Sequence, residues 1–343
     1  MWRRWIMRKV RVAVVGYGQI GPVHVRSYKK HEDKVEVTVV VDLLEERRKS
    51  AQEQFGIKDV AADYNEVLKR DDIDAVSVCI PTYQHHDLVL AAARHGKHVF
   101  CEKPMCMSME DAYEMEEVCK KAGVKLQLGF VRRYDNQWLK FKEIVKSGTV
   151  GKPVVWRSAS AGYGAPSTWF FQRELGGGPF LDGAVHNYDF GNYMFGKVAY
   201  VSAHGSTIQP DRTGVDTGIA EVVYESGDRL QLMWSWGLKR GVRGGSVHDV
   251  LGQEGALVFN APNKNPLTSE NPDVQYLTVN RENGIEEPFA YDRNDMFADQ
   301  MGDFIDTIIQ DKEPKVSAKH GQEALKVGLS LLKSFETGKS VFL

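Results

Sequence analysis

The sequence predicts two successive domains: a doubly wound α/β domain over residues 9–130, and an α+β domain over residues 131–343 built on a large, mostly antiparallel open β-sheet. In the first segment, short β-branched runs alternate with longer amphipathic stretches, as in a parallel sheet wound with helices. In the second, long stretches alternate apolar and polar residues, which favours antiparallel strands with one packed face. The basic residues 1–8 are expected to form a disordered extension.

Five runs in the first domain are apolar enough to be interior strands of a parallel sheet, which is buried on both faces. They are Val10–Val15, Val35–Val41, Ala75–Ile80, His98–Cys101 and Lys125–Gly129. Helices are predicted between them at Leu43–Phe55, Leu88–His95 and Met109–Ala122. A glycine follows each of these helical stretches, as expected for the left-handed residue that ends many helices.

The second domain is predicted to begin with a helix at Gln137–Lys146. Its most regular strand patterns are Val154–Ala159, Gly218–Tyr224 and Arg229–Trp236, and the segments Gly237–Gly245 and Pro262–Pro272 are predicted loops. Two helices, at about Asp295–Gln310 and Lys319–Thr337, close the chain and are expected to pack back against the domain junction.

The composition favours a small-molecule partner. The 343 residues include 44 basic and 46 acidic side chains without a long charged block, so neither nucleic acid nor an anionic membrane surface is an expected partner. No segment approaches the roughly 18 apolar residues of a membrane helix. The four cysteines lack paired CxxC spacing, so we expect reduced thiols in a cytoplasmic protein, with no metal site and no disulfide.

The strongest local signal is a glycine turn that directly follows the first predicted strand. It consists of Gly16, Tyr17, Gly18, Gln19, Ile20 and Gly21. Gly16 permits a tight turn, Gly18 lets a pyrophosphate approach the backbone, and Gly21 lets the next helix pack closely on the strand. The helix N-terminus then offers backbone N–H groups to the phosphates. The turn predicts a dinucleotide site.

Asp42 ends the second predicted strand, where the adenosine ribose of the dinucleotide should lie. Its carboxylate can accept hydrogen bonds from both ribose hydroxyls and would repel a 2′-phosphate, so NAD is favoured over NADP. Arg47 and Arg48 lie about one helical turn further on and keep NADP as the alternative. Asp42 could instead simply cap the following helix.

A third group of cofactor candidates follows the strand predicted at Ala75–Ile80. Ligands of doubly wound folds bind at the carboxyl ends of the strands. Pro81, Thr82 and His85 are therefore expected to contact the nicotinamide side of NAD. His85 and His86 do not form a metal pair, because adjacent residues on a helix do not share a face.

Four motifs in order resemble the Gfo/Idh/MocA oxidoreductases, a family that includes glucose–fructose oxidoreductase and inositol dehydrogenase. The motifs are Gly16–Gly21, Cys101–Pro104, Gly129–Asp135 and Gly176–His186. The resemblance covers nearly the whole chain. It implies an N-terminal Rossmann domain, bound NAD and oxidation of a hydroxyl group.

The same resemblance implies an active site made of Lys103, from the Glu-Lys-Pro motif, together with Asp182 and His186. It also implies that Glu102 positions NAD or Lys103, and that the peptide bond before Pro104 is cis. Each residue alone has a plainer interpretation: Lys103 as a solvated lysine in a turn, and His186 as a hydrogen-bonded helix histidine.

The spacing of Asp182 and His186 fits this role. If Gly183–Phe195 is helical, residues four apart share a face, so the carboxylate can orient the imidazole or bind a substrate hydroxyl. His186, with a reference pKa of about 6.5, can take the hydroxyl proton while Lys103 donates a hydrogen bond to the alkoxide. The sequence leaves open which of the two is the formal base.

Further substrate contacts are expected from Arg132, Tyr163 and Trp169, and from Asn187 and Asp189 beyond the histidine. Trp169 could equally be a core residue. The run Arg132–Asp135 most resembles the inositol dehydrogenase branch of the family, whereas Arg157–Arg173 departs from it. The expected substrate is a cyclic polyol such as inositol, or a sugar, oxidised to a ketone or lactone.

Two other functions stay open: a glycosidase that retains NAD and oxidises its substrate transiently, and a non-catalytic NAD-binding regulator. Lys103, Asp182 and His186 argue against the regulator. The bare face of the predicted antiparallel sheet further predicts a homo-oligomer, because a large apolar surface is rarely left exposed to water. The sequence does not decide between a homodimer and a homotetramer.

Overall fold

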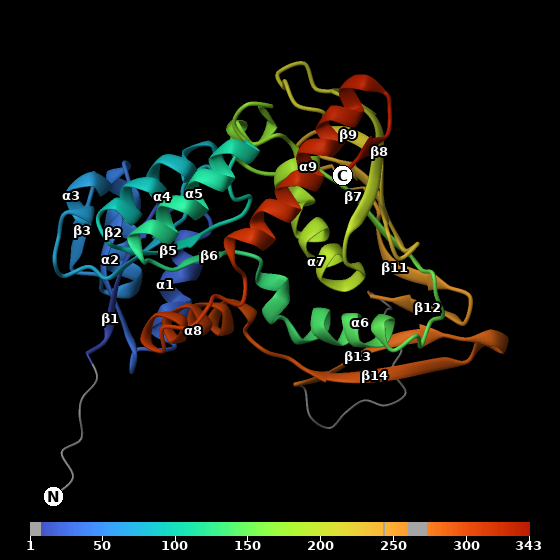
Figure 1. Cartoon of the computed structure of the whole chain (residues 1–343), viewed down its shortest axis with the longest axis horizontal. Coiled ribbons are helices and arrows are strands. Elements are labelled where there is room, and N and C mark those ends of the chain that lie inside the picture. The colour runs from blue at the N-terminus through green and yellow to red at the C-terminus, as the bar shows by residue number, and fades with distance from the viewer. Residues whose placement is uncertain (1–7, 243, 260–272) are drawn as a thin grey trace, which may run out of the picture. The chain divides into compact units, whose positions relative to one another are not determined.

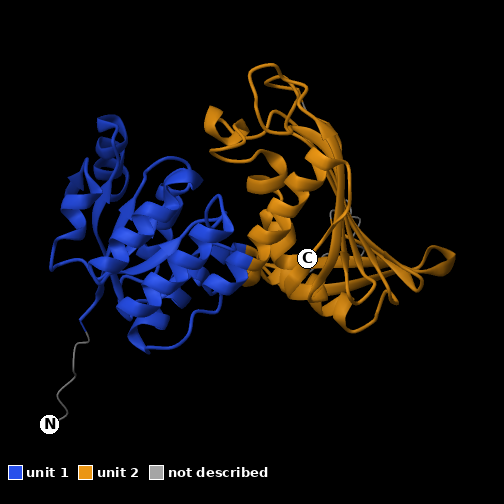
Figure 2. Cartoon of the chain, turned by 45° about the horizontal axis from the view of Figure 1, so that its top comes forward, with its two compact units in different colours: residues 1–131, 295–322 blue, residues 132–294, 323–343 orange. Residues whose placement is uncertain are grey.

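The computed structural model describes residues 8–242, 244–259 and 273–343. They form two compact units, residues 1–131 with 295–322 and residues 132–294 with 323–343, coloured separately in Figure 2. The expected extension 1–8, apart from Arg8, and the predicted loop Pro262–Pro272 lie outside the described residues. The first unit includes residues 295–322 in addition to the N-terminal segment, so the chain returns to it after most of the second unit.

The first unit contains a six-stranded sheet over its described residues, with all strands parallel in the order β3-β2-β1-β4-β5-β6. The strands are β1 (Val10–Val15), β2 (Val35–Val41), β3 (Asp59–Ala61), β4 (Ala75–Val78), β5 (His98–Cys101) and β6 (Leu126–Leu128). The predicted doubly wound domain is confirmed. The direction of winding reverses beside β1, which makes its carboxyl end the expected ligand site.

The helices of this unit are α1 (Gly21–Lys29), α2 (Glu45–Phe55), α3 (Tyr64–Leu68), α4 (His85–Arg94), α5 (Met109–Ala122) and α8 (Met296–Ile309). Helices α4 and α5 pack together, while α1 packs against α8 (Figure 1). His31 and Lys34, just beyond α1, bind the Ala298 carbonyl and Asp306 of α8. These contacts explain why α8 belongs to the first unit.

The described part of the second unit contains a nine-stranded sheet in the order β14-β13-β12-β11-β7-β10-β9-β8-β15, in which only β7 and β10 pair in parallel. Its strands are β7 (Val155–Ala161), β8 (Val198–Ser206), β9 (Thr217–Tyr224), β10 (Arg229–Ser235), β11 (Ser246–Gly252), β12 (Gly255–Val258), β13 (Val274–Asn280), β14 (Glu286–Asp292) and β15 (Val341–Phe342). The predicted open, mostly antiparallel sheet is confirmed.

One face of this sheet is covered by α6 (Asn136–Lys146), α7 (Val185–Phe195) and the part of α9 (Ala318–Thr337) that lies in the second unit (Figure 2). Trp138 of α6 contacts Trp156 of β7, with ring centroids 5.9 Å apart. Phe335 of α9 lies against Gly205 and Gly218 of β8 and β9. Residues of β10 alternate between buried and exposed, as the sequence predicts.

No helix within the described residues is both long and apolar enough to cross a membrane.

Candidate active site

The glycine turn joins β1 to α1 at the carboxyl edge of the parallel sheet. Gly16 has a φ of +95°, and a Cβ on it would lie 2.4 Å from the carbonyl oxygen of Cys79, beyond the end of β4. A Cβ on Gly21 would lie 2.2 Å from the carbonyl oxygen of Gly16. Both positions therefore require glycine, which brings the ends of β1, β4 and α1 into close contact.

The middle of the turn fits a dinucleotide. A Cβ on Gly18 would have Arg47 as its nearest neighbour, at 3.7 Å, so Gly18 keeps this surface of the turn accessible. Gln19 beside it is exposed, whereas the side chain of Tyr17 lies in the core. The helix begins after Ile20, whose side chain cannot cap it, and its first turn holds Pro22 rather than an acidic residue. Such a helix start favours a bound phosphate.

Asp42 contacts this turn directly. Its carboxylate is 8% exposed and accepts a hydrogen bond from the backbone N–H of Tyr17 at 2.7 Å, and another from Leu44 at 2.9 Å. Arg47 lies 3.4 Å from the same carboxylate, while Arg48 binds the backbone carbonyl of Asp42. The N-cap of α2 is Leu44, so the capping interpretation of Asp42 is wrong.

Pro81, Thr82 and His85 follow β4 at the same edge, where Thr82–Gln84 form a short 3-10 helix, η1. Thr82 is buried, and both ring nitrogens of His85 face backbone carbonyls, of Pro104 at 2.8 Å and of Ile80 at 2.9 Å. His85, the first residue of α4, therefore links the end of β4 to the turn that carries Lys103. Its contact with NAD stays a prediction.

Glu102 and Lys103 follow β5, and the Lys103–Pro104 peptide bond is cis, which confirms that expectation. Glu102 is 8% exposed, with Oε1 2.9 Å from Nε2 of His24 and Oε2 accepting from the backbone N–H of Lys103 at 3.2 Å. Burial acts to raise the pKa of Glu102, but the hydrogen bond and charge of His24, together with Lys103, outweigh it and lower that pKa.

In the second unit, Asp182 and His186 do not lie on one regular helix. Asp182 is buried in a π-helical turn, η4 (Pro179–Gly183), whereas half-buried His186 lies in the first turn of α7, which begins at Val185. The expectation of a helix from Gly183 is therefore wrong at its start. Gly178, with a φ of +74°, and Pro179 introduce the wider turn instead.

Arg132 comes to the start of α7 across 55 residues of sequence. Its Nη1 donates to Oδ1 of Asn187 at 2.8 Å, and its guanidinium stacks 4.1 Å above the ring of Trp138. Burial lowers the pKa of Arg132 to about 9, so the group is still a cation at neutral pH. Arg132 and Asn187 thus form a polar pair directly beside His186.

Asp189 does not match its expected role. Both of its carboxylate oxygens bind the guanidinium of Arg133, at distances between 2.7 and 3.1 Å, and the pair is almost completely buried. A bidentate buried pair holds its carboxylate in place and leaves little access for a substrate hydroxyl. Asp189 therefore anchors η2 (Val131–Tyr134) to α7 instead of facing a ligand.

Tyr163 and Trp169 belong to an aromatic group beside β10. Half-buried Trp169 stacks on Phe170 with centroids 3.7 Å apart, and the Tyr163 ring lies 5.9 Å from that of Phe171. A Cβ on Gly183 would lie 2.7 Å from Trp236, so η4 packs on the same aromatic group. Trp169 is partly exposed and is not a core residue.

His24 of α1 is the site neighbour that sequence reasoning missed. It is fully buried three residues after Gly21 and contacts Glu102 of the Glu-Lys-Pro motif. The available signal was a histidine on the buried face of α1, which also carries Val25 and Tyr28. A lone histidine at such a position is usually a hydrogen-bonded core residue, so the pattern alone did not single it out.

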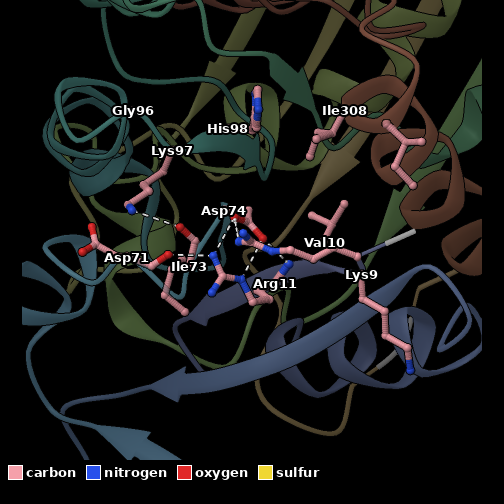
Figure 3. Close-up of a pocket in the computed structure, with 12 residues that line it drawn as sticks. Lys9, Val10, Arg11, Asp71, Ile73, Asp74, Gly96, Lys97, His98 and Ile308 are labelled. Carbon is pink, nitrogen blue, oxygen red and sulfur yellow. Dashed lines mark hydrogen bonds and ion pairs between the residues drawn. The ribbon is translucent and has the colours of Figure 1, made fainter. Parts of the chain in front are cut away.

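A separate hollow of about 920 Å³ lies at the opposite, amino edge of the parallel sheet (Figure 3). Arg11 binds Asp74 and the carbonyl of Asp71 there, and Lys97 donates to the carbonyl of Ile73. These cations already stabilise strand starts and loops, and the lining residues are distinct from the predicted site residues. The hollow is a structural feature of the first unit.

Comparison with known proteins gives matches along most of the chain. Residues 10–130 match the model of an oxidoreductase family with an NAD-binding Rossmann fold, and residues 138–258 match the Gfo/Idh/MocA C-terminal domain. The chain is 32% identical to a myo-inositol 2-dehydrogenase of Thermotoga maritima, covering 97% of this chain and 98% of that protein. It is 28% identical to an NAD-dependent scyllo-inositol 2-dehydrogenase of Bacillus subtilis, covering 98% and 96%.

A solved structure described as a probable dehydrogenase from Thermotoga maritima matches with a TM-score of 0.75 and 29% identity, over 97% of this chain and 99% of that one. The two family models match part of each unit, in the order that the four sequence motifs predict. The chain therefore belongs to the Gfo/Idh/MocA family and is an NAD-dependent oxidoreductase.

Proposed function

We propose that the protein oxidises a secondary hydroxyl group of a cyclic polyol, with inositol as the first candidate, and reduces NAD. The observation that carries this proposal is the turn at Glu102–Pro104. It follows β5 at the same sheet edge as the glycine turn after β1, so Lys103 is presented at the edge where the dinucleotide fits. Membership of the family supports the same assignment.

The cofactor would be held by the backbone of Gly16–Gly21, by Asp42 at the adenosine ribose, and by Pro81, Thr82, His85, Glu102 and Lys103 nearer the nicotinamide. When bound, NAD supplies the acceptor for hydride from the carbon that bears the hydroxyl group. Arg47, 3.4 Å from Asp42, is the residue best placed to tolerate the additional phosphate of NADP.

The chemistry on the substrate is assigned to Lys103, Asp182 and His186. Lys103 Nζ donates a hydrogen bond to the substrate oxygen and stabilises the negative charge that develops there. The hydroxyl proton passes to the imidazole of His186 or, where Lys103 is neutral, to Lys103 Nζ. Asp182 orients the imidazole or accepts a hydrogen bond from a neighbouring substrate hydroxyl.

Substrate selection is assigned to Arg132, Tyr163 and Trp169. Arg132 is held by Asn187 and Trp138, so its remaining donors would have a fixed direction. Half-buried Tyr163 and Trp169 would offer aromatic surface to the C–H face of a ring. The names of two relatives, a myo-inositol and a scyllo-inositol dehydrogenase, favour inositols over open-chain sugars.

The test is a panel of inositols, aldoses, anhydrosugars and glycosides assayed with NAD by the absorbance of NADH. We expect steady release of NADH with at least one inositol. Cleavage of a glycoside without net NADH would identify the NAD-retaining glycosidase instead. Tight NAD binding without turnover of any compound would contradict the proposed dehydrogenase.

We also propose that the uncovered face of the nine-stranded sheet pairs two copies of the chain. The pairing register places Val247, Met233, Ile219 and His204 in one row across β11, β10, β9 and β8, with Ala159 of β7 between the first two. Met233 is 66% exposed and Ile219 54%, and both line a shallow hollow of about 500 Å³. An exposed apolar row of this kind is typical of an interface.

Replacing Met233 by Glu should convert the oligomer to a monomer, because a charge would be buried at the centre of the paired faces. Light scattering after size exclusion measures the mass. Tyr113→Glu, at a 56% exposed position of α5, is the matched control and should leave the mass unchanged. A monomeric wild type, or an unchanged Met233→Glu oligomer, would contradict the assignment of this face.

A further inference from the structure

A chain of buried polar side chains leads through the first unit to the turn that carries Lys103. Nδ1 of His24 lies 2.8 Å from Oγ of Ser77, and the same Oγ lies 3.2 Å from the Tyr28 hydroxyl. Nε2 of His24 lies 2.9 Å from Oε1 of Glu102. His24 and Ser77 are completely buried and Tyr28 is 1% exposed. The hydrogen-bonded series thus runs from Tyr28 of α1 to Ser77 of β4, back to His24 of α1, and on to Glu102 just after β5.

The donors and acceptors along this chain define a direction. An ionised Glu102 can only accept, so Nε2 of His24 must donate to Oε1, while the backbone N–H of Lys103 donates to Oε2. In the neutral tautomer, Nδ1 then accepts from the Ser77 hydroxyl, which in turn accepts from Tyr28. The Cys79 thiol, 3.2 Å from Nδ1, is a second donor to the same nitrogen. With His24 neutral, every hydrogen bond therefore points toward the carboxylate, and the donation from Nε2 to Glu102 holds in the protonated state as well.

The carboxylate of Glu102 is also confined sterically. A Cβ on Gly129 would lie 2.9 Å from its carboxyl carbon and both oxygens, so glycine at the end of β6 leaves room for the group and no more. The ring of Phe100 meets the imidazole of His24 edge-on, with centroids 5.2 Å apart. Histidine and carboxylate are thus held in one relative position by their surroundings.

We propose that His24 is a positioning residue that acts through Glu102 to fix the backbone turn presenting Lys103, and thereby sets the turnover rate. Glu102 holds the backbone N–H of Lys103 with one oxygen and His24 with the other. Loss of the second contact leaves a buried carboxylate free to seek another partner, which displaces the turn. This inference rests on the proposed catalytic role of Lys103.

Two substitutions separate this role from simple packing. In His24→Gln, the side-chain amide can reach the position of Nε2 and donate to Glu102, whereas in His24→Asn the shorter amide reaches only the Ser77 side. We expect His24→Asn to lower kcat by about 10-fold to 100-fold, the scale of a small misplacement of a catalytic group. The kcat of His24→Gln should stay within about 3-fold of the wild-type value, and the Kd for NAD should change little in either variant.

Val25→Ala is the stability control. Val25 is the next residue of α1 and is also completely buried, but its side chain takes no part in the polar chain. The substitution Val25→Ala should lower the melting temperature without changing kcat. Equal losses of kcat in both His24 variants, in proportion to their loss of thermal stability, would overturn the proposal. Failure of both His24 variants to fold would also overturn the proposal, because His24 would then be needed for folding and not specifically for turnover.

A readout without substrate follows from the assigned tautomer. In full-length protein labelled with ¹⁵N-histidine, His24 should carry its proton on Nε2, in a slowly exchanging resonance that is absent from His24→Asn and shifted in Glu102→Gln. A proton on Nδ1 alone would overturn the proposal.

The rate measurements use the best substrate of the panel, with myo-inositol tried first, and include Lys103→Ala. Wild-type turnover by Lys103→Ala would contradict the proposed function itself. If Lys103→Ala is inactive while His24→Asn keeps wild-type kcat, only the role of His24 is contradicted. In a double-mutant cycle, His24→Asn should add little to the loss of kcat caused by Glu102→Gln. Additive losses of kcat would also overturn the proposed role of His24.

Discussion

The carboxyl edge of the parallel sheet in the first unit and the η4–α7 segment of the second hold the predicted site residues by different means. In the first, short turns directly after strands fix each group, as at Gly16 and Lys103. In the second, Asp182 lies in a π-helical turn packed on aromatic side chains far away in sequence, and His186 lies in the first turn of α7 just beyond it. The predicted cofactor residues thus carry short sequence patterns directly after strands, although long-range contacts such as His24 with Glu102 also hold them, whereas the residues predicted for the substrate side carry no such local pattern.

This difference predicts where substitutions should abolish turnover and where they should change selectivity. Replacing Lys103 or His186 by Ala should lower kcat by at least about 100-fold, the scale of lost acid–base catalysis. Because the glycine turn and Asp42 remain, both variants should still bind NAD, more weakly in Lys103→Ala, which also loses a proposed cofactor contact; this separates a loss of chemistry from a loss of cofactor. Steady-state NADH formation measures the loss of chemistry, and titration of protein fluorescence with NAD measures cofactor binding. Near-normal turnover in both variants would remove the proposed mechanism.

The packing around His248 predicts that this residue makes the stability of the second unit fall in acid. His248 accepts a hydrogen bond from Nε1 of Trp156 at 3.0 Å within an aromatic group that includes Trp138. Burial, together with the charge of Arg132, lowers the pKa of His248 to about 3. An unfolded histidine titrates near 6.5, so the unfolded state binds more protons between these values, and stability falls as the pH drops from about 6.5 toward 3.

His248→Gln tests this effect, because glutamine can accept from Trp156 but does not titrate in this range. The wild type should lose about 2 kcal/mol more unfolding free energy between pH 7 and pH 4.5 than the variant does. Urea unfolding followed by tryptophan fluorescence suits the test, since Trp138, Trp156, Trp169, Trp234 and Trp236 all belong to the second unit. Equal losses of unfolding free energy in the wild type and in His248→Gln would show that His248 does not control the acid sensitivity.

The smallest predicted effect concerns the choice of cofactor in the first unit. Asp42→Ala removes the carboxylate that would accept from the ribose and leaves Arg47 beside Gly18. We expect the preference for NAD over NADP to narrow by about 10-fold, the scale of one or two lost charged hydrogen bonds. The ratio of the kcat/KM values for NAD and NADP measures this preference. An unchanged ratio would mean that another residue contacts the ribose.

The same contrast explains what could be predicted from the sequence. The glycine turn, Asp42 and the Glu-Lys-Pro turn are short patterns next to apolar strands, so their placement on one sheet edge follows from the order of elements. The start of α7 was predicted wrongly because the π-helical turn depends on Gly178 and on packing against Trp236. The pairing of Asp189 with Arg133 joins segments 56 residues apart, and no local pattern indicates it.

Short or half-buried elements account for the remaining differences. Strand β3 has three residues, all of intermediate exposure, which is too little for an alternating or continuous apolar pattern. The outer strands β13 and β14 do alternate, but β14 interleaves exposed and half-buried residues and includes Pro288. They are recognisable only once the sheet pairs them.

The fate of the hydrogen on the oxidised carbon tests the proposed dehydrogenation most directly. Myo-inositol deuterated at its ring carbons, or the best substrate of the panel labelled in the same way, is incubated with the protein and NAD, and the NADH is analysed by mass spectrometry. Direct hydride transfer predicts deuterium in the NADH released by the wild type, whereas Lys103→Ala should form no labelled NADH. Unlabelled NADH, or consumption of substrate with no NADH released, would contradict direct dehydrogenation of a hydroxyl-bearing carbon.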